Sequence, residues 1–323
     1  MSSNVNPIEI KLFYNNYNVT SDFSPYIESI VYKDFFQNQC DELSIVINDT
    51  NQLFQKSWYP EKGAKLYCTI QQGSELLNCG TFTIDEITLD ISNYGNRLEI
   101  NALAVTNALP LRTVKSDYYE KTTLNSIAQQ IATKYGLKLL SFPSLSEEIV
   151  IERINQTNET DLAFLKRIAK EYGYIFKITD NLLTFIKLYN PKPVLTLSKN
   201  DIKSITIKDS SVKKYKGCQI DYYNPTKKVL ETVRTGDTNG DILKLKQKFN
   251  SREEALEIIE AQLDKVSKEI SGRISLKNPL STFLSGVDFT LTDMGVFNGN
   301  YRILSATHVV NSNGWQVSAD FEK

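Results

Sequence analysis

Apolar residues recur at every second position in much of the first hundred residues. In the segment 43–48 the repeated positions are Leu43, Ile45 and Ile47, and this alternation predicts a strand with one buried face. The neighbouring runs are rich in β-branched and aromatic residues, and Asn, Asp, Gly and Pro separate them. The pattern is typical of an antiparallel sandwich or barrel. It predicts a first β-barrel over residues 1–107.

A helical period of apolar residues replaces this alternation after Pro110. Between residues 121 and 136 the apolar side chains fall on one helical stripe, with Thr122 or Thr123 available as the N-cap and Gly136 as the stop. The members of the stripe are Leu124, Ile127, Ala128, Ile131 and Tyr135. The pattern therefore predicts an α-helix in this part of the chain.

A second helix is predicted directly afterwards. Asn158 can cap it with Asp161 at the third helical position, where an acid suits the helix dipole, and Gly173 ends it. The residues that follow predict a β-hairpin that turns at positions 180–181. Two helices and a hairpin define a small α+β insert over residues 108–196.

β patterns return after the insert and continue to the end of the chain. They predict a second β-barrel over residues 197–323. One helix interrupts it near residues 251–270, where Ser251 and Glu254 form a capping box.

An internal repeat links the two β regions. Three matches occur in the same order in both: Ile27, Ser29 and Ile30 with Ile202, Ser204 and Ile205, then Gly63 with Gly286, then Gly80, Phe82 and Ile84 with Gly299, Tyr301 and Ile303. The spacing between the first and second matches is longer in the second copy, and the predicted helix lies there. We interpret the repeat as a duplication. The predicted fold is mainly β, with two related antiparallel β-barrel domains flanking a small α+β domain.

The net charge and the N-terminal segment argue against two classes of partner, nucleic acids and membranes. The net charge is −1, with 37 Lys and Arg against 38 Asp and Glu, whereas binding to phosphates needs clustered positive charge. We therefore expect no specific binding to nucleic acid. The N-terminus has no secretory signal pattern, and no apolar run approaches the ~20 residues of a membrane-spanning helix. We expect no stable membrane anchor.

The cysteines predict no metal site and no disulfide. Four cysteines and a single histidine have no close ligand spacing, so neither a metal nor another cofactor is expected. A two-residue turn at Gly73 and Ser74 would place Cys68 directly opposite Cys79. Without an export signal, two free thiols that pack as small apolar groups are the preferred interpretation.

No catalytic motif is present in the sequence. Nucleophile-elbow, phosphate-loop, dinucleotide-binding and zinc-protease patterns are all absent. His308 lies in a strand pattern without a nearby nucleophile, and the helix start accounts for Glu159 and Asp161. We predict that the protein is not an enzyme.

Two motifs resemble a known family. The first consists of Gln156, Asn158, Glu159, Asp161, Phe164, Leu165, Arg167, Ala169 and Gly173, and the second of Gly299, Tyr301, Ile303, His308 and Trp315. Both resemble the baseplate hub proteins of contractile phage tails, the phage late control D family, which is similar to the N-terminal, hub-like part of VgrG spike proteins. We interpret these residues as determinants of the fold.

The resemblance implies a homotrimer in which two barrels per chain build a ring of six domains. Such a ring joins the six-fold tail tube to the three-fold spike. The implied partners are the tail-tube protein, other baseplate proteins and a separate trimeric spike protein, because no needle-like repeat precedes Lys323. The protein would be made in the bacterial cytoplasm and assembled into a phage tail baseplate or a contractile injection particle.

Two alternatives remain open from the sequence alone. Seventeen tyrosines are compatible with a tail-associated module that binds cell-wall glycan. A peptidoglycan hydrolase would need an acid and a base placed together, for which Glu159 and His308 are the candidates.

Overall fold

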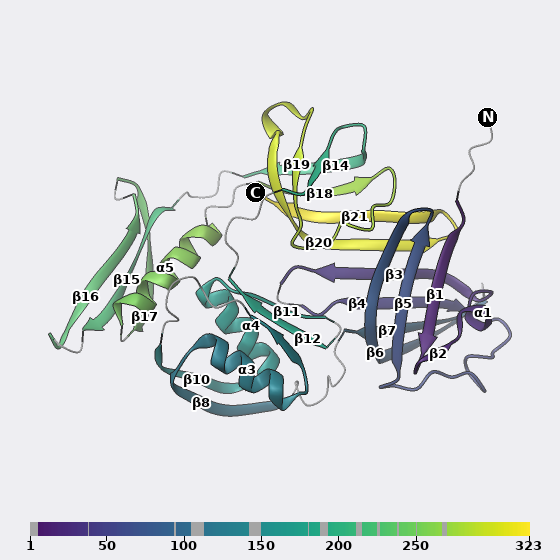
Figure 1. The fold of residues 1–323 in the computed structure, drawn as a ribbon, viewed down its shortest axis with the longest axis horizontal. Helices are drawn as coiled ribbons and strands as arrows, with labels where there is room; N and C mark the ends of the chain where they lie inside the picture. Colours follow the sequence, from purple (N-terminus) through teal and green to yellow (C-terminus); the bar gives the residue numbers. More distant parts are fainter. Residues whose placement is uncertain are drawn as a thin grey trace.

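The computed structural model describes residues 6–37, 39–93, 95–104, 113–141, 150–179, 181–187, 193–210, 215–224, 227–237, 239–249, 251–266 and 270–323. The fold is mainly antiparallel β, with one 13-stranded sheet and three smaller sheets among these residues (Figure 1). No helix in these ranges is long and apolar enough to cross a lipid bilayer.

The first β unit confirms the predicted alternation. Its elements are β1 (Ile8–Tyr14), β2 (Tyr17–Asn18), α1 (Thr20–Phe23), β3 (Ile27–Phe35), β4 (Glu42–Asn48), β5 (Lys65–Gln72), β6 (Glu75–Ser92) and β7 (Gly95–Leu103). The strands lie in the order β3-β4-β7-β6-β5-β1-β2. Leu43, Ile45 and Ile47 of β4 are fully buried, as expected for a strand with one face in the core.

The second β unit has the same strand order. Its elements are β13 (Leu195–Leu197), β14 (Ile202–Asp209), β18 (Ile270–Leu276), β19 (Asp288–Leu291), the 3₁₀ helix η1 (Gly295–Phe297), β20 (Gly299–Asn311) and β21 (Gly314–Glu322). The order β14-β18-β21-β20-β19 corresponds to β3-β4-β7-β6-β5 of the first unit, position by position.

β-bulges recur at equivalent residues of the two units. The register between β3 and β4 shifts between Ile27 and Ser29, and that between β14 and β18 shifts between Ile202 and Ser204. In the same way, β6 shifts against β7 after Ile84, and β20 shifts against β21 after Ile303. A bulge is a specific backbone feature that the sequence match alone does not require. The two β units are therefore structural duplicates.

The two units join through their edges. β20 of the second unit pairs antiparallel with β3 of the first, from Ser305 opposite Phe35 to Asn311 opposite Ser29. This pairing turns both units into one continuous sheet (Figure 1), and a single hydrophobic cluster runs through both.

The middle unit contains the predicted helices and hairpin. Its elements are β8 (Val114–Thr122), α3 (Leu124–Lys134), β9 (Lys138–Leu140), β10 (Ile151–Thr160), α4 (Asp161–Tyr172), β11 (Ile175–Thr179) and β12 (Leu182–Ile186). Thr123 caps α3 and accepts a hydrogen bond from the Ser126 amide, as predicted. β11 and β12 form the hairpin. Position 180 of its turn, and the predicted domain boundary between residues 107 and 108, lie outside the described residues.

Residues 215–266 differ from the prediction. The sequence placed them in the second barrel, but β15 (Tyr215–Asn224), β16 (Val229–Gly236) and β17 (Asp241–Phe249) form a separate sheet. The following helix, α5 (Arg252–Val266), packs against β15 and α4. Its buried Ile258 and Ile259 share a hydrophobic cluster with Phe164 of α4. This sheet and helix extend the middle unit (Figure 1), because their apolar side chains belong to its hydrophobic core.

Only half of the predicted capping box at α5 is present. The Glu254 amide donates to the Ser251 hydroxyl over 3.1 Å. The carboxylate of Glu254 turns inward instead and accepts a 2.7 Å hydrogen bond from the Tyr172 hydroxyl of α4. Docking of α5 on α4 thus replaces the local contact that a capping box would make.

The cysteine register is a correction. The turn at Gly73 and Ser74 is present, but a bulge inserts Cys79, so that Cys68 lies opposite Gly80. Both thiols are free and buried.

Candidate functional site

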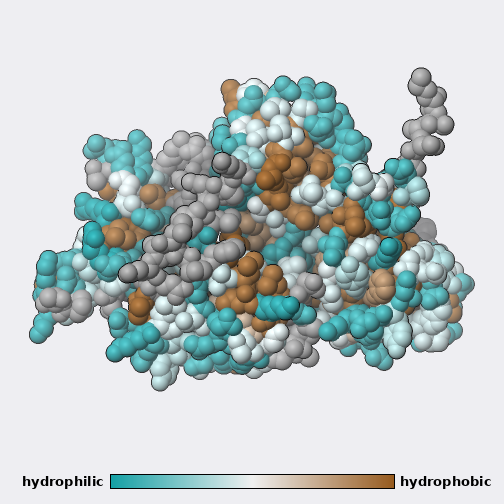
Figure 2. Space-filling view, viewed as in Figure 1, coloured by the Kyte–Doolittle hydropathy of each residue, from teal (hydrophilic) through white to brown (hydrophobic). Residues whose placement is uncertain are grey.

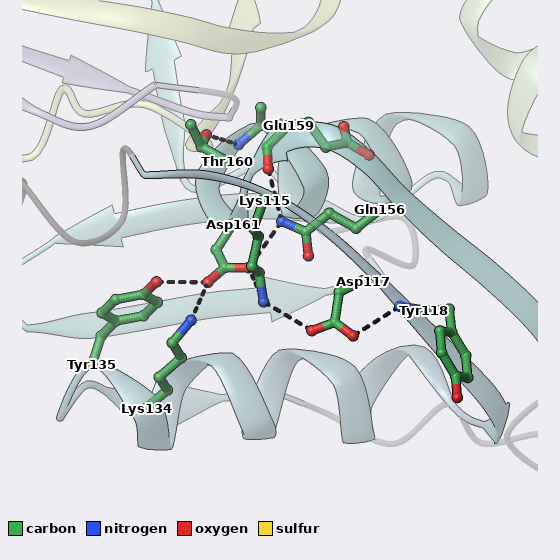
Figure 3. A network of polar contacts seen from close by, with 10 residues as sticks. Lys115, Asp117, Tyr118, Lys134, Tyr135, Gln156, Glu159, Thr160 and Asp161 are labelled. Carbon is green, nitrogen blue, oxygen red and sulfur yellow. Dashed lines mark hydrogen bonds and ion pairs between the residues drawn. The ribbon is translucent and has the colours of Figure 1, made fainter.

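The first motif builds a buried polar network around Asp161, whose side chain is 1% exposed. Lys134 and the Tyr135 hydroxyl contact its Oδ2 at 3.0 and 2.6 Å. Lys115 and the amide of Gln156 contact Oδ1, each at 3.0 Å. Figure 3 shows how α3, β8 and β10 each send side chains to this one carboxylate at the start of α4.

The contacts around Asp161 favour its charged form. Burial would raise the pKa of this carboxyl group, but hydrogen bonds from Tyr135, Lys115, Lys134 and Gln156 outweigh burial and lower the pKa to about 2. The Gln156 amide also donates to the carbonyl of Glu159 at 3.0 Å. Asp161 is thus a permanent anion that ties the helix layer to the antiparallel strand pair of β8 and β10.

The N-cap of α4 is Thr160, and the prediction of Asn158 as its cap is wrong. The Thr160 hydroxyl accepts a hydrogen bond from the Ala163 amide at 3.0 Å. Asn158 lies in a bulge of β10, with a left-handed φ of 51°, a conformation that Asn tolerates better than most residues. Its amide donates to the Ser116 hydroxyl. The role of Asn158 is therefore to shape the chain before the helix begins.

The remaining residues of the first motif fix α4 in place. Arg167 contacts Glu159 at 2.7 Å and donates to the carbonyl of Asn155 at 2.8 Å. Phe164 stacks on Tyr119 with ring centroids 5.4 Å apart. Leu165 and Ala169 are fully buried in the same core.

Gly173 ends α4 where a side chain would not fit. Its φ is 74°, in the left-handed region that favours glycine. A Cβ atom at this position would lie 2.8 Å from the Cβ of Ala261 in α5. The glycine therefore ends one helix and lets a second helix approach closely.

The second motif surrounds a fully buried histidine. His308 Nε2 lies 3.2 Å from the carbonyl oxygen of Phe283, and the Trp315 indole N–H donates to His308 Nδ1 over 3.3 Å. Since Nδ1 accepts, Nε2 carries the proton and donates it to the carbonyl. Burial lowers the pKa of His308 to about 4. The imidazole is neutral and holds β20, β21 and the loop before β19 together.

The other members of the second motif also have structural positions. Ile303 and Tyr301 are buried in the shared core, and the Tyr301 hydroxyl donates to the carbonyl of Phe297 at 2.7 Å. Gly299 opens β20 with a φ of 150°. The structure gives none of these residues an exposed reactive group.

A charged junction that the sequence patterns did not predict lies where all three units meet. Lys177 of β11 forms ion pairs with Asp34 of β3 and with Asp41, the latter at 3.1 Å. Asp34 also accepts a 2.6 Å hydrogen bond from the Ser285 amide in the second β unit. The Thr179 hydroxyl donates to Asp41 at 2.8 Å.

Burial and ion pairing oppose each other at this junction. Burial raises the pKa of Asp41 well above its usual range, despite the nearby Lys177 ammonium. Burial would lower the pKa of Lys177, but the carboxylates of Asp34 and Asp41 outweigh it and raise the pKa. Because these partners are more than 130 residues apart in the chain, no local pattern could have revealed them.

The two candidate groups of a hydrolase, Glu159 and His308, both make contacts within the fold. Glu159 is engaged by Arg167, and His308 is fully enclosed. Glu159 lies in the middle unit and His308 in the second β unit, so the two groups do not converge on one substrate atom. Across the described ranges, no group of three or more His, Cys, Asp or Glu side chains is placed to hold a metal ion.

Solved structures share this architecture. Two duplicated β units around an α+β unit form a fold that is also found in phage tail proteins and in a VgrG protein. A tail protein from Neisseria meningitidis MC58 shares it with a TM-score of 0.71 at 12% identity, over 98% of this chain and 96% of that one. The E. coli c3393 protein, a type VI secretion component with structural similarity to the T4 tail proteins gp27 and gp5, matches with a TM-score of 0.60 at 12% identity. That match covers 98% of this chain and 76% of the other.

A curated relative narrows the class further. The probable baseplate hub protein of Escherichia phage 186 is 30% identical over 198 residues, which are 59% of this chain and 49% of the relative. The chain spans about half the length of the curated relatives it matches. No protein-family model matches the chain. The resemblance to baseplate hub proteins, drawn above from two motifs, is confirmed.

Proposed function

We propose that the protein is the baseplate hub of a contractile phage tail or related injection particle. Three chains form a ring of six similar β units, which joins a six-fold tail tube to a three-fold spike. The observation that carries this proposal is the duplication, with equal strand order and equal bulges in both β units. The confirmed similarity to a baseplate hub protein supports it independently.

Symmetry gives the duplication a physical purpose. A closed ring presents the same surface to a partner once per repeat, so three identical chains match a three-fold spike. With two similar β units per chain, the same ring presents six nearly equivalent surfaces to the tube. A chain with only one such unit would need a different number of copies for each partner.

Assembly would occur with separate proteins. The partners we propose are a trimeric spike protein, the tail-tube protein and other baseplate proteins, after synthesis in the bacterial cytoplasm. Apolar residues form patches on the face of the molecule that Figure 2 shows. The exposed apolar side chains of the described residues include Leu89 and Ile91 of β6, and a single chain with such side chains fits a component of a larger assembly.

The role we propose is structural and not enzymatic. The candidate acid and base of a hydrolase are occupied by Arg167 and by the Phe283 and Trp315 contacts. Both groups thus make contacts that stabilise the fold.

Mass measurement in solution tests the proposal. Light scattering of the purified 36.8 kDa chain is expected to give about 110 kDa for a closed trimer, and electron micrographs of the same peak are expected to show rings. A monomer at every concentration, also after mixing with spike and tube proteins, would contradict the proposal. Binding of that monomer to cell-wall glycan would then favour the glycan-binding alternative.

A further inference from the structure

Each of the two strands that form the internal β3–β20 junction has a duplicate elsewhere in the chain. The two duplicates do not pair with each other within one chain, because they lie at opposite edges. In the repeat, β3 corresponds to β14, and the second half of β20 corresponds to the second half of β6. The equivalence is fixed by the bulges, since Ser29 matches Ser204 and Ser305 matches Glu86. Within one chain, β3 pairs with β20, whereas their duplicates β14 and β6 do not pair with each other.

The two remaining edges have a strand on one side only. Among the described residues, β14 pairs with β18 and with no other strand. β6 pairs with β5 only as far as Thr83, and beyond this residue its single partner is β7. Two open edges of this kind can each take up a further strand.

The side chains on these edges match a buried junction. In the internal pairing, one face is covered, with Ile30, Tyr32, Ala306, His308 and Val310 all at most 7% exposed. Their duplicates are Ile205, Ile207, Ile87, Leu89 and Ile91. All five are apolar, although Leu89 is 43% and Ile91 is 65% exposed in the single chain. Apolar residues at these positions are explained if a second strand covers them.

We propose that the second half of β6 in one copy pairs antiparallel with β14 of the next copy. The occupant of each edge is thus a second copy of this chain. Transfer of the internal register predicts that Leu89 lies opposite Ile207, with Thr88 opposite Lys208 and Asp90 opposite Thr206. This inference rests on the proposed ring, and it adds the strands and the register that close it.

The contact is head-to-tail, because the two edges are different surfaces. A heterologous contact of this type closes into a ring when its rotation divides the circle. Each chain then contains one complete internal junction. It also contributes β6 to an external junction with one neighbour and β14 to an external junction with the other. If external and internal junctions have the same geometry, as the duplication predicts, successive β units are related by one constant rotation.

Disulfide trapping tests the register. The Phe36 amide donates to the carbonyl of Leu304 over 2.9 Å, so Lys33 and Thr307 form a non-hydrogen-bonded pair, in which side chains are close. Their duplicates are Lys208 and Thr88, both exposed. The double variant Thr88→Cys/Lys208→Cys is oxidised and run on a non-reducing gel. It is expected to give covalent dimers and trimers that reduction converts to monomer.

Matched controls separate register from mere proximity. Thr88→Cys/Thr206→Cys uses the same face of the same strands, but it is two residues out of register, about 7 Å along the strand. We expect at least roughly fivefold less cross-linking, because such a separation is too long for a disulfide. A variant with only one of the introduced cysteines is expected to stay monomeric on the gel. If the chains instead formed a symmetric dimer, in which the same edge of each copy pairs with itself, such a variant would cross-link.

The outcomes distinguish this inference from the proposed function. Cross-linking of the in-register pair only supports both. A trimer by light scattering in which the in-register pair does not cross-link, or does so no better than the shifted pair, overturns this register and leaves the hub in place. A monomer without cross-linking of any pair overturns both.

Discussion

The indole N–H of Trp315 donates a hydrogen bond to Nδ1 of His308 across 3.3 Å, within the core of the second β unit. This contact selects one tautomer of the imidazole and directs the Nε2 proton to the carbonyl of Phe283. The histidine that a sequence-based search would rank first as a catalytic base is therefore a neutral connector between strands.

Removal of this connector is expected to weaken the fold. His308→Ala leaves the Trp315 N–H and the Phe283 carbonyl without their partner and opens a cavity, at a cost of about 2–4 kcal/mol in the free energy of unfolding. Urea denaturation of the variant measures the loss. Thr307→Ala, one residue earlier in β20 and only half-buried, serves as the control. An equal effect of both variants would contradict the role assigned to His308.

The same histidine predicts a pH dependence. Its pKa is about 4 in the folded protein against 6.5 for an ordinary histidine. Between these values the unfolded chain binds a proton that the folded chain does not, so the free energy of unfolding falls as the pH falls from about 6.5 to 4. The expected loss is about 3 kcal/mol over this window. In His308→Ala this component should disappear, and urea denaturation at several pH values tests it.

Asp161 is expected to be the most sensitive position of the first motif. Asp161→Asn leaves the Lys115 and Lys134 ammonium groups without the buried anion that they share, at a cost of about 3 kcal/mol. Because the pKa of Asp161 is about 2, its contribution is present above the ordinary value of 3.8 and is lost as the pH falls towards 2.

Glu159→Gln provides the comparison within the same motif. Its partner Arg167 is 42% exposed, and solvent screens such a pair, so we expect a loss below about 1 kcal/mol. Thermal unfolding of both variants at neutral pH ranks the two. A larger effect of Glu159→Gln would mean that the Asp161 network is not what anchors α4.

Most of the fold could be predicted from the sequence, because the periodicity of apolar residues along the chain determines most of its strands and helices. Alternation in β4, the helical stripe of α3 and the glycine stop after α4 are each decided by residues close in the chain. The duplication was visible for the same reason, since Gly80, Phe82 and Ile84 recur in order. Bulges at Ile84 and Ile303 add to this finding, but they follow from strand pairing that a sequence does not display.

Long-range packing decided what the sequence could not predict. Glu254 leaves its expected capping box because the buried Tyr172 hydroxyl offers it a partner from another helix. Thr160 replaces Asn158 as the cap of α4 because the bulge in β10 delays the helix by two residues. The Lys177 junction is the extreme case, as its members come from three separate units.

At that junction, two neighbouring carboxylates are expected to respond differently. Burial favours the protonated form of Asp41, and an asparagine there can still accept from the Phe35 amide. The Thr179 hydroxyl, which donates to Asp41, can rotate and accept a hydrogen bond from the asparagine side-chain amide instead. We therefore expect Asp41→Asn to change the free energy of unfolding by less than about 1 kcal/mol. Asp34→Asn removes the main counter-charge of Lys177 and should cost about 3 kcal/mol. Urea denaturation at neutral pH compares them, and equal losses would contradict this assignment.

The exposed apolar side chains of β6 separate assembly from folding. Leu89→Lys and Ile91→Lys place charges where the next chain is proposed to pack, and each is expected to convert a trimer into monomers by light scattering. Far-UV circular dichroism should stay unchanged, because both side chains face solvent in the single chain. Leu76→Lys is the matched control, since Leu76 lies on the same strand and is 56% exposed, yet it precedes the edge that pairs with β14. If Leu76→Lys dissociated the trimer and Leu89→Lys did not, the contact between chains would lie at a surface other than the proposed β6 edge.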